Sequence, residues 1–73
     1  MQREPVASSS IATVGYDAST QTLEIEFHNG RIYQFFGIPP EMAEAMRAAS
    51  STGAYFNKYV RNGGYEFSVV RDA

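Results

Sequence analysis

The sequence predicts one small α+β domain, in which a three-stranded antiparallel meander packs with two short helices. Two alternating runs flank Asn29-Gly30, and this dipeptide between such runs is a strong signal for a β-hairpin. Apolar residues at helical spacing follow Pro40, and glycines interrupt the chain after each helical stretch. A chain of 73 residues has room for a single core but not for a deep substrate cavity as well.

Composition excludes several classes of protein. The chain has no cysteine, which excludes disulfides and thiolate zinc sites. No apolar run approaches the ~20 residues that span a bilayer. The polar start Met1–Pro5 does not resemble a signal peptide. We therefore expect a cytoplasmic protein with no membrane partner.

The expected domain occupies residues 8–66. Residues 1–7 have only Val6 as an apolar anchor, so we expect a flexible N-terminus. Residues 67–73 are expected to form a C-terminal tail or a short strand, because apolar residues alternate over 65–69.

Three strands are expected within this domain. The first covers the β-branched and aromatic run 11–16, and Asp17 then opens a turn by accepting main-chain hydrogen bonds. The second and third cover 23–28 and 31–36, on either side of the central turn. Consecutive strands joined by short turns form a meander.

The register of the central hairpin has two solutions. A two-residue turn at Asn29-Gly30 places Tyr33 and Phe35 on the outer, acidic face of the sheet. A three-residue loop with a bulge at the glycine places Ile25 opposite Tyr33 and Leu23 opposite Phe35, on the core side. We favour the second solution, because each large side chain that is buried stabilises the fold by ~1.5–3 kcal/mol.

Two short helices are expected after the sheet. The first covers about Glu41 to Ser50, with proline at its start and acidic residues in its first turn. The second covers about Ala54 to Arg61 and is capped by the serines before it. Their apolar stripes consist of Met42, Ala45, Met46 and Ala49 in the first helix, and of Tyr55, Phe56, Tyr59 and Val60 in the second.

Nothing in the sequence indicates catalysis. Glu24, Glu26 and His28 alternate on one strand face, but side chains two residues apart on a strand are too distant for easy chelation. We interpret them as a solvated face and expect no metal and no cofactor. The serines and glycines form no nucleophile elbow and no phosphate-binding loop.

A binding surface is indicated by the aromatic and basic residues. Residues 17–44 carry five acidic and one basic side chain, whereas residues 45–71 carry four basic and one acidic. Aromatic and basic residues alternate in the second half, as on surfaces that bind single-stranded nucleic acid. The alternative is that the aromatic residues over 55–60 form only the core stripe of a helix. The candidate binding residues are Arg31, Tyr33, Phe35, Lys58, Arg61 and Tyr65.

Several short motifs stand in an order and at a spacing that resemble those of a known family. They are Ser9-Ser10-Ile11, Gly15-Tyr16-Asp17, the run Leu23–Gly30, Tyr33-x-Phe35, Ile38-Pro39, Ser51–Asn57 and Val60-Arg61. Together they resemble the KTSC domain, a bacterial module that is found at the C-terminus of some lysine-tRNA synthetases and also alone. The family's central Tyr-x-Tyr corresponds to Tyr33 and Phe35, so the second hydroxyl is missing here. The resemblance implies a small domain of unknown activity, with RNA binding suggested by its association with the synthetase.

Two hypotheses about function follow. The first is a non-catalytic RNA-binding accessory module, whose affinity for RNA is weak and salt-sensitive because the net charge is −2. The second is a protein-interaction or self-association module, in which a protein partner or a second copy covers an exposed sheet edge.

Overall fold

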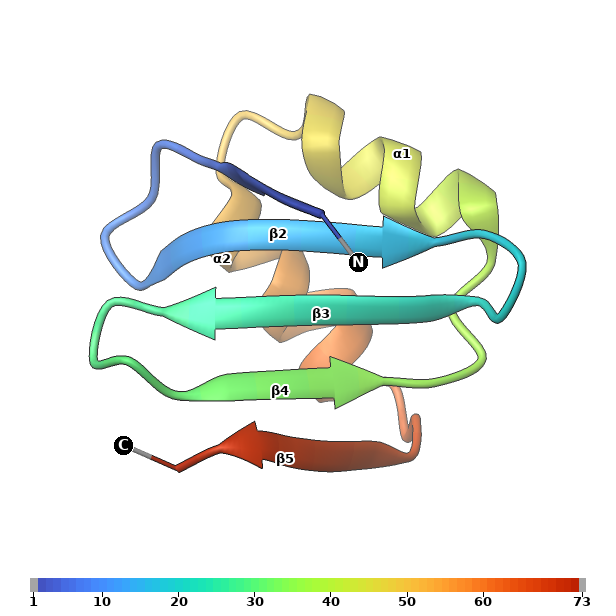
Figure 1. Cartoon of the computed structure of the whole chain (residues 1–73). Coiled ribbons are helices and arrows are strands. Elements are labelled where there is room, and N and C mark those ends of the chain that lie inside the picture. The colour runs from blue at the N-terminus through green and yellow to red at the C-terminus, as the bar shows by residue number, and fades with distance from the viewer. Residues whose placement is uncertain (1, 73) are drawn as a thin grey trace.

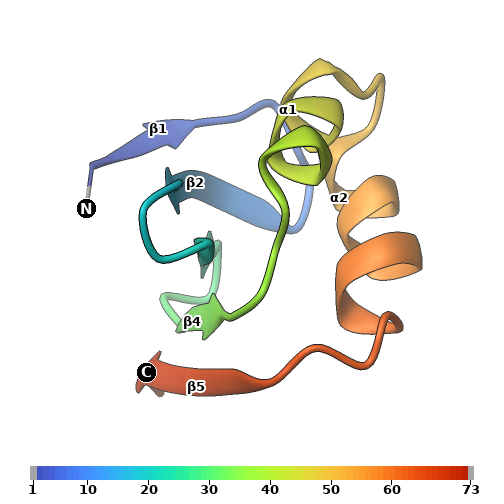
Figure 2. The same cartoon turned by 90° about the vertical axis from the view of Figure 1, so that its right-hand side faces the viewer.

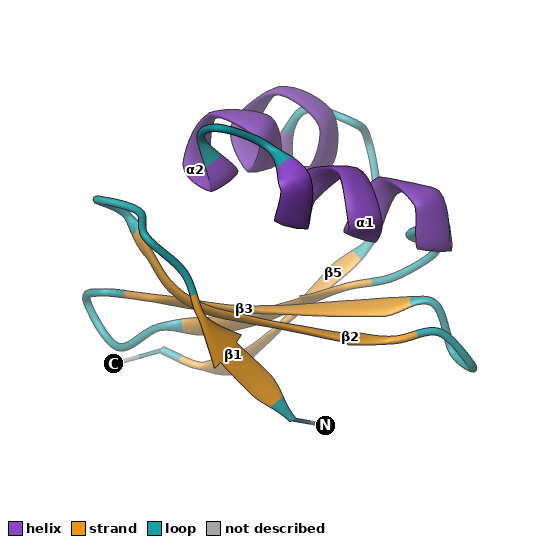
Figure 3. Cartoon of the chain, turned by 90° about the horizontal axis from the view of Figure 1, so that it is seen from above, coloured by secondary structure: helices purple, strands orange, loops and turns teal. Residues whose placement is uncertain are grey.

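The structure is a computed structural model that describes residues 2–72. These residues form a five-stranded antiparallel sheet with its strands in chain order, and the helices cover one face of it (Figure 1 and Figure 3). The strands are β1 (Arg3–Pro5), β2 (Ile11–Asp17), β3 (Thr22–Phe27), β4 (Ile32–Phe35) and β5 (Phe67–Arg71), and the helices are α1 (Pro40–Ala48), α2 (Thr52–Tyr55) and the π-helix η1 (Phe56–Arg61). None of the helices in this part of the chain is long and apolar enough to cross a membrane.

The sheet is wider than the three-stranded meander expected from the sequence. That meander corresponds to β2, β3 and β4, and one further strand lies on each side. β5 is the short C-terminal strand that the alternation of apolar residues allows. β1 lies in the stretch expected to be flexible, and three residues that end in proline give no strand pattern. It is held by pairing with β2 and by an ion pair of 2.9 Å between Arg3 and Glu24.

The central hairpin adopts the register that buries its aromatic residues. Leu23 lies opposite Phe35 and Ile25 opposite Tyr33, as predicted for a three-residue loop. Gly30 has a φ of +90°, and its N–H donates to the carbonyl of Phe27 at 2.9 Å. A left-handed conformation at this position favours glycine, which has no Cβ. The glycine therefore sets which face of β4 meets the core.

α1 packs on the sheet through its apolar stripe. It starts at Pro40, one residue before the expected start, and ends at Ala48, two residues before the expected end. Met46 is its buried residue and belongs to the core between helices and sheet. The buried members of that core are Ile11, Leu23, Ile25, Phe35, Ile38, Met46, Phe56 and Val60.

The second helical segment starts two residues earlier than expected and widens along its length. The hydroxyl of Ser51 caps it by accepting a hydrogen bond from the N–H of Ala54 at 3.2 Å. The segment continues as the π-helix η1 and ends at Arg61, as predicted. The chain then passes close to the helix end, because a Cβ on Gly63 would lie 2.4 Å from the main-chain oxygen of Tyr59. Only glycine fits this approach.

Polar contacts fix the turn between β2 and β3. The N–H and hydroxyl of Ser19 both donate to one carboxylate oxygen of Asp17, at 3.0 and 2.6 Å, and these bonds hold the pKa of Asp17 below its usual range. The hydroxyl of Tyr16 donates to the carbonyl of Ile38 at 2.6 Å. Partial burial, and then the negative charges of Glu41 and Asp17, raise the pKa of Tyr16. The turn is thereby joined to the start of the helical layer.

We expect Gln21→Gly to stabilise the protein. Gln21 has a φ of +54°, the one positive φ among the non-glycine residues within 2–72, and such a conformation strains a side chain that has a Cβ. Glycine relieves this strain in the folded chain but also makes the unfolded chain more flexible, which opposes folding. The net effect should be a rise of about 0.5 kcal/mol in the free energy of unfolding, measured by urea titration. The matched control is Ala18→Gly in the same turn at negative φ, which should lower it. The same sign for both variants would contradict the prediction.

We expect the acid stability of the fold to depend on Asp17. Because its pKa is lower in the folded chain, its ionised form favours folding above the unfolded pKa, near 4, and this contribution is lost as pH falls through the folded pKa. Asp17→Asn should therefore flatten the fall in melting temperature below about pH 4. Ser19→Ala keeps the charge but removes the hydroxyl bond, so it should flatten the fall only in part. If the melting temperature of both variants falls with pH as it does in the native chain, Asp17 does not contribute to the acid stability and the prediction is wrong.

Candidate functional site

The fold forms a groove on the helix side of the sheet, between the β3–β4 hairpin, β5 and the end of η1. Its volume is about 670 Å³. Figure 2 shows how the chain runs from the end of η1 to β5. We call it the aromatic groove; its walls consist of Phe27, Asn29, Arg31, Tyr33, Phe35, Phe56, Arg61, Gly64, Tyr65 and Phe67.

The floor of the aromatic groove is a continuous cluster of rings. Tyr33 and Phe35 alternate on β4, and their ring centroids are 6.3 Å apart in a stacked arrangement. Phe67 on β5 lies opposite Phe35 and contacts both rings, with centroid distances of 5.7 and 5.9 Å. Phe27 meets Tyr33 edge to face at 5.7 Å, and Phe56 meets Phe35 in the same way at 5.3 Å. Neighbouring rings fix each other's orientation, so the floor is preorganised.

Exposure differs along the floor. Phe35 and Phe56 are buried, with exposed fractions of 6% and 2%, and they join the floor to the core. Tyr33 and Tyr65 are partly buried. Phe67 is 58% exposed at the outer edge. The outer rings therefore present apolar surface to solvent, which is uncommon for large side chains without a partner.

Two guanidinium groups flank the rings. Arg31 follows the hairpin loop, and its Nε lies 3.1 Å from a carboxylate oxygen of Asp72. Both side chains of this pair are exposed, so the pair is screened by solvent and weak. Arg61 at the end of η1 has no ion-pair partner within residues 2–72. Both cations are available to an anionic ligand.

Five of the six predicted binding residues line this groove: Arg31, Tyr33, Phe35, Arg61 and Tyr65. Lys58 is not one of the residues that line it. Its Nζ lies 5.2 Å from the ring centroid of Tyr59, which in turn packs against Tyr55 at 4.5 Å.

Three rings of the groove are not among the predicted binding residues. Phe56, which was expected only in the core stripe of the second helix, belongs to both the core and the groove. Phe27 ends β3 next to the loop, and Phe67 lies in the stretch expected to be a tail or strand. The excess of aromatic residues over what a small core can hide is the signal that was available for Phe67.

The predicted solvated face of β3 is a network of hydrogen bonds. Glu24 contacts Arg3 and accepts from Gln34 Nε2 at 2.8 Å. Glu26 accepts from Thr13 Oγ1 at 3.0 Å and from Arg71 Nη2 at 3.1 Å. Across residues 2–72, no three histidine or acidic side chains converge as a metal site would require.

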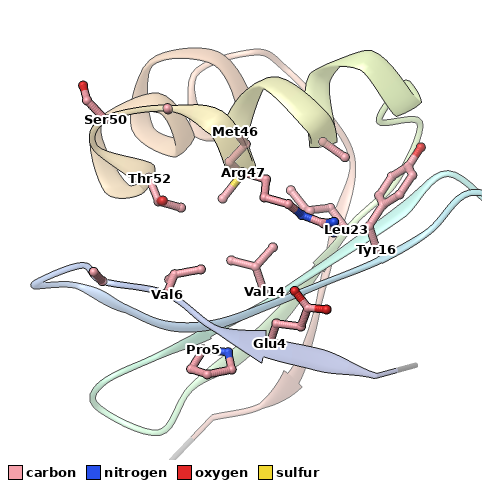
Figure 4. A pocket seen from close by; sticks show the side chains of 13 residues that line it. Glu4, Pro5, Val6, Val14, Tyr16, Leu23, Met46, Arg47, Ser50 and Thr52 are labelled. Atoms are coloured by element: carbon pink, nitrogen blue, oxygen red, sulfur yellow. The ribbon is translucent and has the colours of Figure 1, made fainter.

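A second, smaller groove of about 330 Å³ lies between β1, β2 and α1. Figure 4 shows Val6 and Val14 on the sheet side and Met46 on the helix side, with Arg47 reaching across toward Tyr16. It contains fewer rings than the aromatic groove and none of the predicted binding residues.

Comparison with known proteins identifies the fold and the family. The family model of the KTSC domain matches residues 7–65. The crystal structure of a KTSC domain protein from Yersinia pestis superposes with a TM-score of 0.86 at 35% identity, covering 96% of this chain and 97% of that one.

Two relatives differ greatly in length. An uncharacterised protein of Stutzerimonas stutzeri is 37% identical over 67 residues, which cover 92% of this chain and 94% of the relative. A lysine–tRNA ligase of Nostoc punctiforme is 41% identical over 62 residues, which cover 85% of this chain but 11% of the ligase. The same small unit thus occurs both as nearly a whole protein and as part of a much longer one. The family match over most of the chain, together with the shared fold, shows that this protein belongs to the KTSC domain family.

Proposed function

We propose that this domain is a non-catalytic module that binds single-stranded RNA in the aromatic groove. The observation that carries the proposal is that the rings of Tyr33, Tyr65 and Phe67 line one groove together with Arg31 and Arg61. Nucleobases stack on aromatic side chains, and each stacked base contributes ~1–3 kcal/mol as judged by alanine substitution. Arginines beside such rings bind the phosphates that connect the bases.

The shape of the groove supports unpaired nucleotides over a duplex. The rings line a groove between the end of η1 and the last two strands, where Tyr33 and Tyr65 are partly buried. Paired bases are stacked within the helix and cannot reach such a floor, whereas bases of loops and ends can be splayed out. Phe35, which lacks the second hydroxyl of the family's Tyr-x-Tyr, is buried, so it supports the neighbouring rings from the core side and does not itself stack on a base.

The charge of the domain supports weak binding. Two cations neutralise about two phosphates, so the logarithm of the association constant should fall with the logarithm of salt concentration with a slope of about −1.4. The net charge of −2 opposes further non-specific contacts. The similarity to part of a lysine–tRNA ligase makes tRNA the natural first RNA, and a tRNA ligand would place the activity in the cytoplasm.

We expect titration with tRNA, followed by amide chemical shifts at low salt, to perturb residues of the aromatic groove. Signals of Arg31, Tyr65 and Phe67 should shift and return as salt is raised. Signals of Arg3 and Glu24 on the opposite face should stay in place. A short unstructured RNA should compete with tRNA, whereas a perfect RNA duplex should not. No shift with any RNA at low salt would contradict the proposed function.

We expect variants to separate the groove from general electrostatics. Tyr65→Ala should weaken RNA binding by about 5- to 100-fold, because it removes one stacking ring, and Tyr65→Phe should retain binding. Arg61→Gln should weaken it by about fivefold. Lys58→Gln is the matched control, since it removes the same charge from the same helix outside the groove. Equal losses for Arg61→Gln and Lys58→Gln would show that net charge alone is responsible.

A second candidate function is association with another chain through β5. Three of its five residues are exposed large apolar side chains, namely Phe67, Val69 and Val70, with exposed fractions of 58%, 46% and 52%. An apolar edge strand of this kind is a template for pairing with a further strand.

A further inference from the structure

β5 is an open edge of the sheet. It is the last strand in the order, all five of its residues are exposed, and within residues 2–72 no element lies beyond it (Figure 1). The N–H of Phe36 donates to the carbonyl of Glu66 at 2.9 Å. Since hydrogen-bonded pairs alternate along an antiparallel ladder, the N–H and C=O groups of Phe67 and Val69 point away from β4. These two residues offer unpaired main-chain donors and acceptors.

The opposite edge of the sheet is not open in the same way. β1 has only three residues and ends at Pro5, which has no N–H to donate. Each chain therefore has one edge that supports pairing. Pairing of β5 with β1 of the next molecule would build an open fibre, whereas pairing of two β5 strands closes after two copies.

We propose that β5 pairs antiparallel with β5 of a second copy of this chain, about a two-fold axis at Ser68. This inference rests on the second candidate function and names its partner. In this register Phe67 of each copy lies opposite Val69 of the other, which places an aromatic ring against a β-branched residue on the helix side. Their outward main-chain groups form four hydrogen bonds, and the pairing ends before the register shift between β4 and β5 near Val70.

Charge and size agree with a weak, closed dimer. The strand is preceded by Glu66 and ends at Arg71, so antiparallel pairing brings the carboxylate end of each copy near the guanidinium end of the other. Arg71 also contacts Glu26 of its own chain at 3.1 Å, an exposed pair that solvent screens. A five-residue edge buries less than the ~1,200 Å² of a standard interface, so association should require high protein concentration. Because the axis is perpendicular to the sheet, both aromatic grooves lie on the same side of the dimer.

A single introduced cysteine tests the register, because the native chain contains none. In the proposed dimer Ser68 faces Ser68 of the second copy in a non-hydrogen-bonded pair, where Cα atoms lie ~4.5 Å apart, within disulfide range. Under mild oxidation Ser68→Cys should form a covalent dimer at least about tenfold faster than Ser9→Cys, an exposed control on another face. Val70→Cys should behave like the control, because Val70 of one copy lies opposite Glu66 of the other, four residues away from the second Val70.

Sedimentation of the native chain up to about 1 mM should show a monomer–dimer equilibrium without larger species. Val69→Pro removes an outward N–H and no bond to β4, so it should weaken the dimer at least about tenfold while its melting curve shows that it is folded. Val69→Thr keeps the N–H and should dimerise.

A native chain that stays monomeric, or equal crosslinking of Ser68→Cys and Ser9→Cys, would overturn the proposal. Titration of the Ser9→Cys variant with RNA tests the aromatic groove by itself, so a failure of RNA binding can be told apart from a failure of dimerisation.

Discussion

The left-handed glycine in the β3–β4 loop is the constraint on which the rest of the structure depends. A φ of +90° at Gly30 permits a three-residue loop and thereby fixes the pairing of the two central strands. A slip of one residue would exchange the two faces of β4. Tyr33 and Phe35 would then lie among the carboxylates of the outer face, and the helices would lose the rings against which they pack. One backbone conformation thus determines both the core and the aromatic groove.

Local chemistry explains what could be predicted from the sequence. Three predicted features depend only on residues that are close in the sequence. They are the hairpin at Asn29-Gly30, the helix cap at Ser51 and the end of the second helix at Arg61. The register followed from a comparison of burial energies, which needed only the identities of the side chains. The family resemblance rested on such local motifs as well, and the fold comparison confirms it.

Long-range contacts explain what could not be predicted. β1 is held by Arg3, whose partner Glu24 lies 21 positions away on the outer face. A local sequence pattern does not predict a strand that depends on such a distant contact. Five of the six residues predicted from the aromatic and basic pattern line the aromatic groove. The position of Lys58 depended on how a π-helix turns its side chains, and a regular helical projection does not provide that.

The position of β1 also bears on how the domain can be attached to other proteins. The chain enters the sheet at β1, and three strands separate this edge from β5, next to which the aromatic groove lies (Figure 1). A domain tethered ahead of residue 2 would therefore leave the groove unobstructed. An extension after residue 72 would begin beside Arg31, whose guanidinium contacts Asp72. Fusion at the first end leaves the aromatic groove clear, and fusion at the second end places a linker beside Arg31, which lines the groove.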